Sequence, residues 1–407
     1  MKANLAVVLG MFETGLAVGR SLGRAGIRVS GLDFARKVGF YSKYIDALIC
    51  PHPLEQEEEF IAFLLRFAAS EKNRPVLFIT SDEFLLPVSR NRKALEQFYL
   101  MNLPNQQIIE CIADKFQQYT LALNAGIPVP QTLVVDNMDQ LLEIKDRIPF
   151  PAFIKGSEVT SWRRKMGGNS FKGFMVSTHE ELIDTFKMIF ERGASALVQD
   201  VIPGPDTNHY KASCYLSRNG EVLLAFGLQK IRQQPPDFGF GCLVQSVRFP
   251  ELLDLGKDFF TKIGYRGVGS AEFKLDTRDG KLKLIELNPR YWQQNALAEK
   301  CGMNFPLVDY LELTDHKPKA VLEYRYGIKW VNIYSDIESF REYRQRGRLS
   351  GRQWLCSLKG EKIYSDLNRD DMMPGLHEMF LGNILRRSSR YIKKLLKFGS
   401  STKITHS

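Results

Sequence analysis

The sequence predicts an α/β protein with a doubly covered parallel sheet, then a mixed α+β part, then a basic extension. Over residues 1–110, short apolar strands alternate with helical patterns, and this rhythm is typical of a parallel sheet with helices on both faces. From residue 152 onward strand signals dominate, and several are joined by hairpin turns. Residues 385–407 carry seven Lys and Arg side chains and no acidic residue.

The first part is expected to be Rossmann-like. Its strands are expected at Leu5–Leu9, Ile27–Leu32 and Val76–Thr80. Its helices are expected at Gly15–Ala25, Phe60–Ser70 and, for the most part, Asp82–Tyr99. The glycines of Gly10–Gly19, with Asp33 after the next strand, resemble a dinucleotide-binding turn, but their spacing differs from GxGxxG. We therefore favour a nucleotide-free domain, and an NAD-linked oxidoreductase is the less favoured alternative.

The second part begins with an expected helix at Asp114–Ala125. Further strands are expected at Thr132–Val135, Phe153–Lys155, Phe174–Val176, Ala196–Val201, Ser213–Leu216 and Val222–Lys230. Further helices are expected at Leu141–Arg147, Glu180–Glu191 and Leu252–Ile263. The segment from Pro235 to Gly241 is expected to be a loop. Later in the chain we expect a strand within Tyr324–Ile333, a helix at Ile337–Arg346 and a basic helix at Met379–Lys397.

Two glutamates lie on opposite arms of a predicted hairpin. The strands Ala271–Asp276 and Lys281–Asn288 flank an Asp-Gly turn. If Arg278–Gly280 form a three-residue loop, Thr277 pairs with Lys281 and Glu272 lies directly opposite Glu286, with Cβ atoms roughly 5 Å apart. Like charges in this position destabilise a sheet, so a divalent cation is one explanation. A solvated charged face is the alternative, because Lys274 and Asp276 share that side. Leu282 and Leu284 are expected on the same side, so the face is mixed rather than fully polar.

The composition, with 44% hydrophobic and 25% charged residues, is ordinary for a soluble protein. Six scattered cysteines without a CxxC pair indicate reduced thiols and a cytoplasmic location. The net charge is +10, and taking away the seven charges of residues 385–407 leaves +3 for the remainder. The basic character therefore belongs to the C-terminal tail.

Six motifs occur in an order that resembles the ATP-grasp superfamily, in its carboxylate–amine ligase branch and among its D-aspartate ligase-like enzymes. The resemblance covers roughly residues 1–310, and its motifs are Asp114-Lys115, Pro151–Lys155, the Gly167–Gly173 loop, Val198–Gly204, Ala271–Lys274 and Ile285–Arg290. The resemblance implies a pre-ATP-grasp domain at 1–112 and an ATP-grasp domain at 113–320, with subdomains at about 130–200 and 201–320. Residues 321–407 form a C-terminal extension outside the match. The basic, aromatic stretch Ser161–Lys165, just before the glycine loop, departs from the family pattern.

The resemblance also implies the role of each matching residue. Phosphates of ATP would contact Lys115, Lys155 and the glycine loop with Gly168 and Lys172. The adenine would be lined by Gln199, Asp200 and Ile202, and the ribose would be bound by Asp206. One or two Mg²⁺ ions, with Mn²⁺ as an alternative, would be held by Glu272, Glu286 and Asn288. Arg290 would stabilise the transferred phosphoryl group or the substrate carboxylate.

The implied reaction joins a small-molecule carboxylate to an amine through an acyl phosphate, producing ADP and phosphate. Lys230 and Arg232 are candidates for binding the acid, and plain surface charge is the alternative interpretation. The segment Ser81–Glu83 could contact the amine, because open α/β sheets bind ligands at the carboxyl ends of their strands. A non-catalytic ATP-binding protein of the same fold is the rival function.

The basic tail has an apolar side and a cationic side, a pattern typical of peripheral contact with anionic membranes. A solvated tail is the alternative, and nucleic acid is not expected as a partner.

Overall fold

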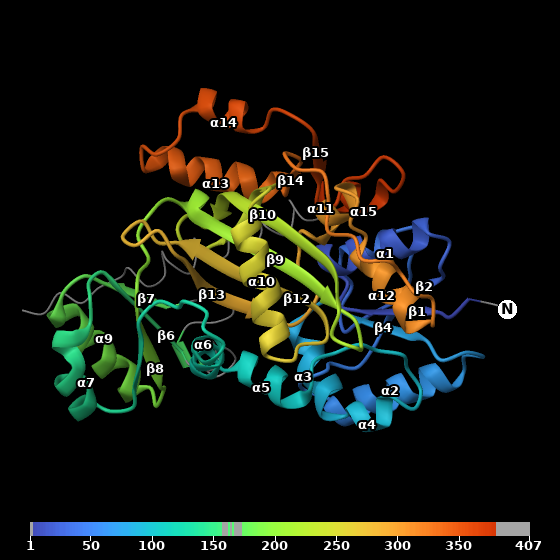
Figure 1. The fold of residues 1–407 in the computed structure, drawn as a ribbon, viewed down its shortest axis with the longest axis horizontal. Coiled ribbons are helices and arrows are strands. Elements are labelled where there is room, and N and C mark those ends of the chain that lie inside the picture. The colour runs from blue at the N-terminus through green and yellow to red at the C-terminus, as the bar shows by residue number, and fades with distance from the viewer. Residues whose placement is uncertain (1–2, 157–161, 163–164, 167–172, 380–407) are drawn as a thin grey trace, which may run out of the picture.

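The computed structural model describes residues 3–156, 162, 165–166 and 173–379. Its strands form a four-stranded parallel sheet, a four-stranded antiparallel sheet and a seven-stranded mixed sheet. Figure 1 shows the seven-stranded sheet in the centre, with the two smaller sheets on either side of it. The predicted α/β class is confirmed.

The N-terminal sheet has the strand order β3-β2-β1-β4, and alternate side chains of its strands enter two different hydrophobic clusters, one on each face. Its strands are β1 (Ala6–Leu9), β2 (Val29–Asp33), β3 (Asp46–Ile49) and β4 (Val76–Ile79). The helices of this part are α1 (Glu13–Arg24), η1 (Val38–Tyr41), α2 (Glu57–Ala69), α3 (Asp82–Arg90), α4 (Arg92–Leu95) and α5 (Gln106–Ala113). The strand β3 was not predicted, because it is an edge strand with three exposed or half-exposed apolar positions rather than a buried run.

The small sheet has the order β5-β8-β6-β7 and follows the linking helix α6 (Lys115–Asn124). Asp114 caps this helix, since its side chain accepts a hydrogen bond from the Gln117 amide at 2.8 Å. The strands are β5 (Thr132–Val135), β6 (Ala152–Gly156), β7 (Phe174–Val176) and β8 (Ala196–Asp200). Helices α7 (Met138–Ile144), η2 (Lys145–Arg147) and α9 (His179–Glu191) belong to the same part.

The large sheet has the order β13-β12-β9-β10-β11-β14-β15. Its first five strands are β9 (His209–Leu216), β10 (Val222–Gln234), β11 (Phe240–Ser246), β12 (Gly267–Leu275) and β13 (Leu282–Asn288). The associated helices are η3 (Asp206–Asn208), α10 (Pro250–Lys262), α11 (Asn295–Lys300) and α12 (Phe305–Leu313). The loop expected up to Gly241 ends earlier, because β11 begins at Phe240 and pairs with β10.

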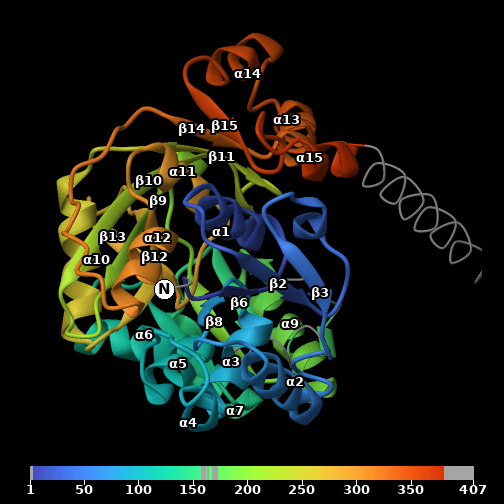
Figure 2. The ribbon, with the colours of Figure 1, turned by 90° about the vertical axis from the view of Figure 1, so that its right-hand side faces the viewer.

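Residues 321–379, here called the extension, add β14 (Lys329–Val331) and β15 (Lys362–Tyr364) to the large sheet. Their helices are α13 (Ile333–Gln345), α14 (Gly351–Ser357) and α15 (Met373–His377). In Figure 2 the extension lies across the N-terminal sheet and the large sheet. Buried ion pairs fix it to both, at 2.8 Å between Arg20 and Asp371 and at 2.7 Å between Arg232 and Asp336.

The hairpin turn differs from the prediction, although the glutamate pairing is confirmed. Asp276, not Thr277, pairs with Lys281, so the loop has one more residue than expected, and Gly280 has the left-handed φ of 69°. A register shift between Glu272 and Phe273 then restores Glu272 opposite Glu286. The same shift turns Leu282 and Leu284 into the core, so these leucines do not share the glutamate face.

Among the described residues, no helix is both long and apolar enough to span a bilayer. The basic helix predicted at Met379–Lys397 lies outside the described residues except for Met379.

Candidate active site

The centre of the site is the cross-strand pair Glu272 and Glu286. Lys211 on β9 and Lys230 on β10 each contact one oxygen of Glu272, at 3.0 Å and 2.9 Å. Burial alone would raise the pKa of Glu272, but the two ammonium groups outweigh burial and hold the pKa well below its ordinary value. The carboxylate is therefore ionised and surrounded by positive charge, with only 13% of its side chain exposed.

Glu286 is the more open carboxylate, with 40% of its side chain exposed. Lys115 Nζ at the start of α6 lies 2.6 Å from Glu286 Oε1. Burial would lower the pKa of Lys115, but the charge of Glu286 outweighs burial and raises it. Tyr119, one helical turn after Lys115, donates a hydrogen bond to the Ile285 carbonyl at 2.7 Å and so fixes α6 beside β13.

Arg290 and Asn288 complete this end of the site. The Arg290 guanidinium makes a two-pronged contact with Asp82 at the start of α3, at 2.7 Å and 2.8 Å. Burial would lower the pKa of Arg290, but Asp82 and then the two glutamates raise it. Arg290 Nη2 also lies 3.4 Å from Asn288 Oδ1. The segment Ser81–Glu83 is thus brought to the site through Asp82.

The small sheet contributes Lys155 and Gln199 from neighbouring strands. Lys155 Nζ donates to Tyr119 Oη at 2.8 Å and to Gln199 Oε1 at 2.9 Å. No carboxylate contacts Lys155 within the part of the chain that the structure describes. An ammonium group at the end of a strand with only neutral partners is suited to bind an anion.

The remaining predicted nucleotide residues lie at the ends of β8 and η3. Ile202 is buried, and Asp200 forms an ion pair with Arg278 of the hairpin tip. Asp206 accepts a hydrogen bond from Gln233 Nε2 at 2.8 Å. Gly168 and Lys172 of the glycine loop lie outside the described residues.

The structure brings Lys230 to the carboxylates but not Arg232. Two residues apart on a regular strand, the two side chains would share a face. Register shifts on both sides of Arg232 break this alternation, and Arg232 instead pairs with Asp336 of α13. The expectation that both residues bind the substrate acid therefore loses its geometric basis for Arg232.

Lys211 was missed because the strand was expected to begin only at Ser213, whereas β9 begins at His209. On the full strand, Lys211 lies on the same face as Ser213, two residues later, and directly opposite Glu272 on β12. The alternating pattern of residues 209–216 was the available signal.

Metal ligands at this site would have to be oxygens from the two glutamates and Asn288. Within the described ranges, no group of three or more His, Cys, Asp or Glu side chains is arranged to hold a metal ion. Two carboxylates and one amide oxygen nevertheless suit Mg²⁺, which takes few protein ligands and completes its shell with water and phosphate.

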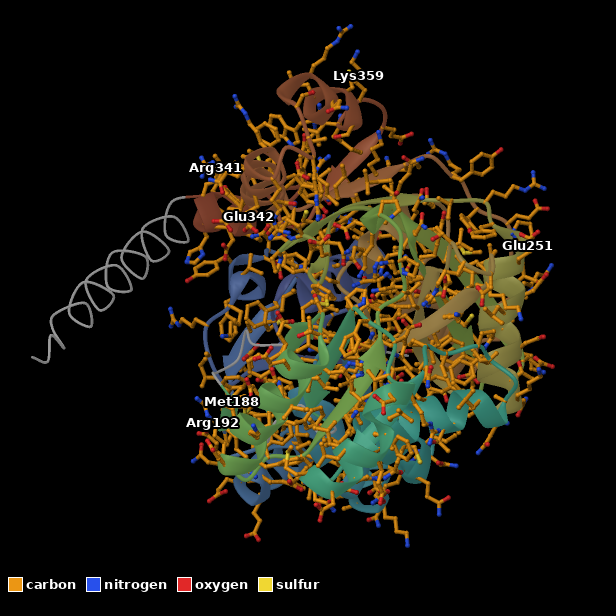
Figure 3. The ribbon with its side chains drawn as sticks, turned by 90° about the vertical axis from the view of Figure 1, so that its left-hand side faces the viewer. Met188, Arg192, Glu251, Arg341, Glu342 and Lys359 are labelled. Atoms are coloured by element: carbon orange, nitrogen blue, oxygen red, sulfur yellow. The ribbon has the colours of Figure 1, made fainter. Side chains whose placement is uncertain are left out.

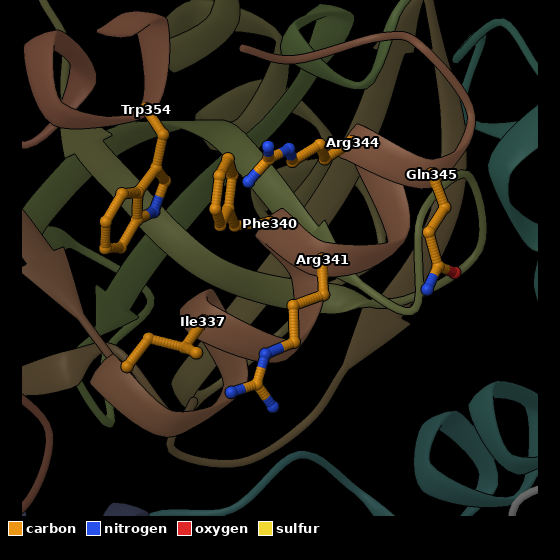
Figure 4. Close-up of a pocket in the computed structure, with 6 residues that line it drawn as sticks. All are labelled: Ile337, Phe340, Arg341, Arg344, Gln345 and Trp354. Carbon is orange, nitrogen blue, oxygen red and sulfur yellow. The ribbon is translucent and has the colours of Figure 1, made fainter. Parts of the chain in front are cut away.

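Two surface hollows lie away from the glutamates. A cleft of about 550 Å³ between α6, the small sheet and the hairpin tip is lined by residues that include Tyr119, Thr132 and Asp200. A groove of about 600 Å³ lies between α13 and α14, and Figure 4 shows Phe340 and Trp354 side by side in it. Neither glutamate lines either hollow.

No protein-family model matches the chain. The D-aspartate ligase of Enterococcus faecium (strain Aus0004) is 25% identical over 374 residues, which are 86% of this chain and 87% of that enzyme. In sequence and fold, the chain is similar to ATP-grasp enzymes. The structure of N5-carboxyaminoimidazole synthetase from Staphylococcus aureus, solved with ADP, matches with a TM-score of 0.61 at 14% identity. The match covers 78% of this chain and 79% of the synthetase chain.

The biotin carboxylase domain of the Hydrogenobacter thermophilus 2-oxoglutarate carboxylase has a TM-score of 0.61 at 17% identity. The match covers 81% of this chain and 74% of the carboxylase chain. That structure was solved with MgADP, ADP and bicarbonate. The resemblance noted in the sequence is therefore confirmed. The chain is an enzyme of the ATP-dependent carboxylate–amine ligase class.

Proposed function

We propose that this enzyme joins a small amino-acid carboxylate to an amine, with D-aspartate as the first candidate for the acid. The observation that carries the proposal is the Glu272–Glu286 pair surrounded by Lys115, Lys211, Lys230 and Arg290. Such a site suits a polyanionic nucleotide and an anionic acid together. The similarity to a D-aspartate ligase supports the choice of acid.

In the first step, a carboxylate oxygen of the acid bonds to the γ-phosphorus of ATP, and the bond from that phosphorus to the bridging oxygen breaks, releasing ADP. In the second step, the amine nitrogen bonds to the acyl carbon and loses a proton, and phosphate leaves with the bonding electron pair. Lys115 and Lys155 neutralise the phosphate chain, and Arg290 neutralises the transferring group or the acid. The chemistry depends on positioning and charge.

Glu272, Glu286 and Asn288 would hold Mg²⁺, or alternatively Mn²⁺, at the nucleotide phosphates. A bound divalent cation supplies neutralisation of the phosphate oxygens. Once Glu272 binds a cation, the buried ammonium groups of Lys211 and Lys230 need another anion, because an unpaired buried charge is costly. The transferring phosphoryl group and the acid carboxylate are the anions that the reaction supplies.

The proposal is tested by measuring ADP release with MgATP and single acids, including D-aspartate, L-aspartate and D-glutamate, in the presence of hydroxylamine. We expect ADP release that depends on the acid, with D-aspartate most active, and formation of the matching hydroxamate. ADP release that is equally fast without acid, or calorimetric ATP binding without turnover on any acid, would contradict the ligase proposal.

For the tail, we propose peripheral contact with anionic membrane, supported by the seven positive charges of residues 385–407. Vesicles of phosphatidylcholine alone and with phosphatidylglycerol are sedimented with the full chain and with a chain ending at residue 383. We expect only the full chain to sediment with the anionic vesicles. Equal sedimentation of both chains would contradict this contact.

A further inference from the structure

The extension reaches the predicted ribose-binding residue, Asp206. Tyr343 on α13 donates a hydrogen bond to Asp206 Oδ2, and the Asp237 amide donates to the same oxygen at 3.2 Å. Gln233 Nε2 donates to Asp206 Oδ1 at 2.8 Å. Asp206 is only 9% exposed, so these three donors determine the direction of its carboxylate.

Helix α13 and the residues after it also hold the segment that supplies the other two donors. Figure 3 labels Glu342 on this helix, and Glu342 Oε1 accepts from Gln234 Nε2 at 3.0 Å. Ser339 Oγ donates to the Gln233 carbonyl at 2.6 Å. Arg346 and Arg348 contact the two oxygens of Asp237 at 2.7 Å and 2.6 Å. Every donor to Asp206 therefore belongs to the extension or is held by it.

A continuous polar chain connects Asp206 with the central glutamate. Lys230 Nζ lies 2.9 Å from Glu272 Oε2 and 3.3 Å from Gln233 Oε1. The amide oxygen of Gln233 thus faces the ammonium group, and its NH₂ group faces the Asp206 carboxylate. Phe238, which follows Asp237 in the loop after β10, stacks on Phe153 of the small sheet with ring centroids 4.8 Å apart.

We infer that Tyr343 is a positioning residue that acts through Asp206 to bind the sugar hydroxyls of ATP. This inference rests on the proposed function. A carboxylate oxygen offers two acceptor positions. Tyr343 and Asp237 fill both positions of Oδ2, and Gln233 fills one of Oδ1, so the remaining position of Oδ1 is left for a ribose hydroxyl. A carboxylate fixed in advance loses less conformational freedom on binding.

The test compares the wild-type enzyme with Tyr343→Phe, using ATP and 2′,3′-dideoxy-ATP as nucleotides. With ATP, we expect the variant to raise KM about tenfold and to keep kcat within about twofold, the size of one hydrogen bond to a charged group. With the dideoxy nucleotide, which has no hydroxyl for Asp206, the variant and the wild type should have the same KM. Tyr326→Phe is the matched control, because Tyr326 belongs to the extension but is 60% exposed.

An unchanged or lower KM for ATP in Tyr343→Phe would overturn the inference, since a lower KM would mean that the tyrosine competes with the sugar. An equal loss with both nucleotides would also overturn it, because it would indicate a structural role only. If the wild-type enzyme turns over no acid, the proposed reaction fails, and calorimetric titration with the same two nucleotides still tests the role of Tyr343.

Discussion

Lys211 lies directly opposite Glu272 on the neighbouring strand, with its ammonium nitrogen 3.0 Å from Glu272 Oε1. The lysine has only 7% of its side chain exposed, and burial lowers its pKa despite the nearby carboxylate. The Gln294 side chain, 3.5 Å away, is a further polar neighbour. A buried cation at this place is pre-organised for an anion that forms during the reaction.

We expect Lys211→Met to lower kcat about 100-fold, the usual loss when one group that stabilises developing charge is removed. Lys230 still compensates Glu272, so the variant should fold. ADP release with saturating ATP and acid measures the effect. Lys257→Met, on the surface of α10, is the control, and a kcat equal to that of the control would exclude a catalytic role for Lys211.

Glu272→Gln should destabilise the enzyme more than Glu286→Gln. The first change leaves two buried ammonium groups without a carboxylate, at a cost of roughly 3–5 kcal/mol. The second removes a charge from a side chain that is 40% exposed, so water can solvate the neighbouring cations, among them Lys115. Thermal unfolding midpoints of both variants, with exposed Glu323→Gln as control, measure the difference. Equal midpoints for the two site variants would show that the lysines do not depend on Glu272.

The sequence carried enough information for the fold class, the order of the motifs and the glutamate pairing, but not for every side chain. Glu272 and Glu286 do pair, although the predicted turn was wrong by one residue and a bulge compensates for it. Bulges depend on tertiary packing and leave little trace in alternating patterns. A similar irregularity in β10 separates Arg232 from Lys230, and no spacing argument could have predicted it.

Contacts between segments that are far apart in the chain could not be predicted from the sequence either. Asp336 and Tyr343 lie in a part of the chain with no recognised motif, and they contact Arg232 and Asp206, which are more than 100 positions away. Such pairs follow from how the extension packs, which local propensity does not determine.

Lys155→Met should raise the Kd for ATP at least about tenfold, because an ammonium group bonded to phosphate contributes roughly 1.5–3 kcal/mol. Its present partners, Tyr119 and Gln199, are neutral and can remain bonded to other groups. Calorimetric ATP affinity measures the effect without turnover. Lys187→Met on α9 is the control, and an affinity unchanged from the control would remove Lys155 from the phosphate site.

The neighbouring residues Asp370 and Asp371 offer a matched comparison of exposed and buried ion pairs. Asp371 is 2% exposed and faces buried Arg20, whereas Asp370 is 37% exposed and pairs with Arg24. We expect Asp371→Asn to lower the unfolding midpoint markedly, by a loss of roughly 3–5 kcal/mol, and Asp370→Asn to cost at most about 1 kcal/mol. Similar midpoints for the two variants would mean that the extension is not held by the Arg20 pair.

Asp309 should make the enzyme less stable as the pH rises toward neutrality. Burial raises the pKa of Asp309 from 3.8 to about 7, although Tyr291 and Tyr215 donate hydrogen bonds to it at 2.8 Å and 2.9 Å. Between these two values the folded state keeps a proton that the unfolded state loses. The unfolded state therefore binds fewer protons, and stability falls with rising pH over this window by on the order of 4 kcal/mol.

Asp309→Asn removes this proton equilibrium. The thermal unfolding midpoint of the wild type, minus that of the variant, should therefore decrease from pH 4 to pH 7. Above pH 7 this difference should stay constant. Asp139→Asn, at an exposed position on α7, should give a constant difference over the same range. Parallel profiles for wild type and Asp309→Asn would mean that the carboxyl is ionised in the folded enzyme. The two tyrosine hydroxyls would then be sufficient to hold a buried negative charge beside Glu312.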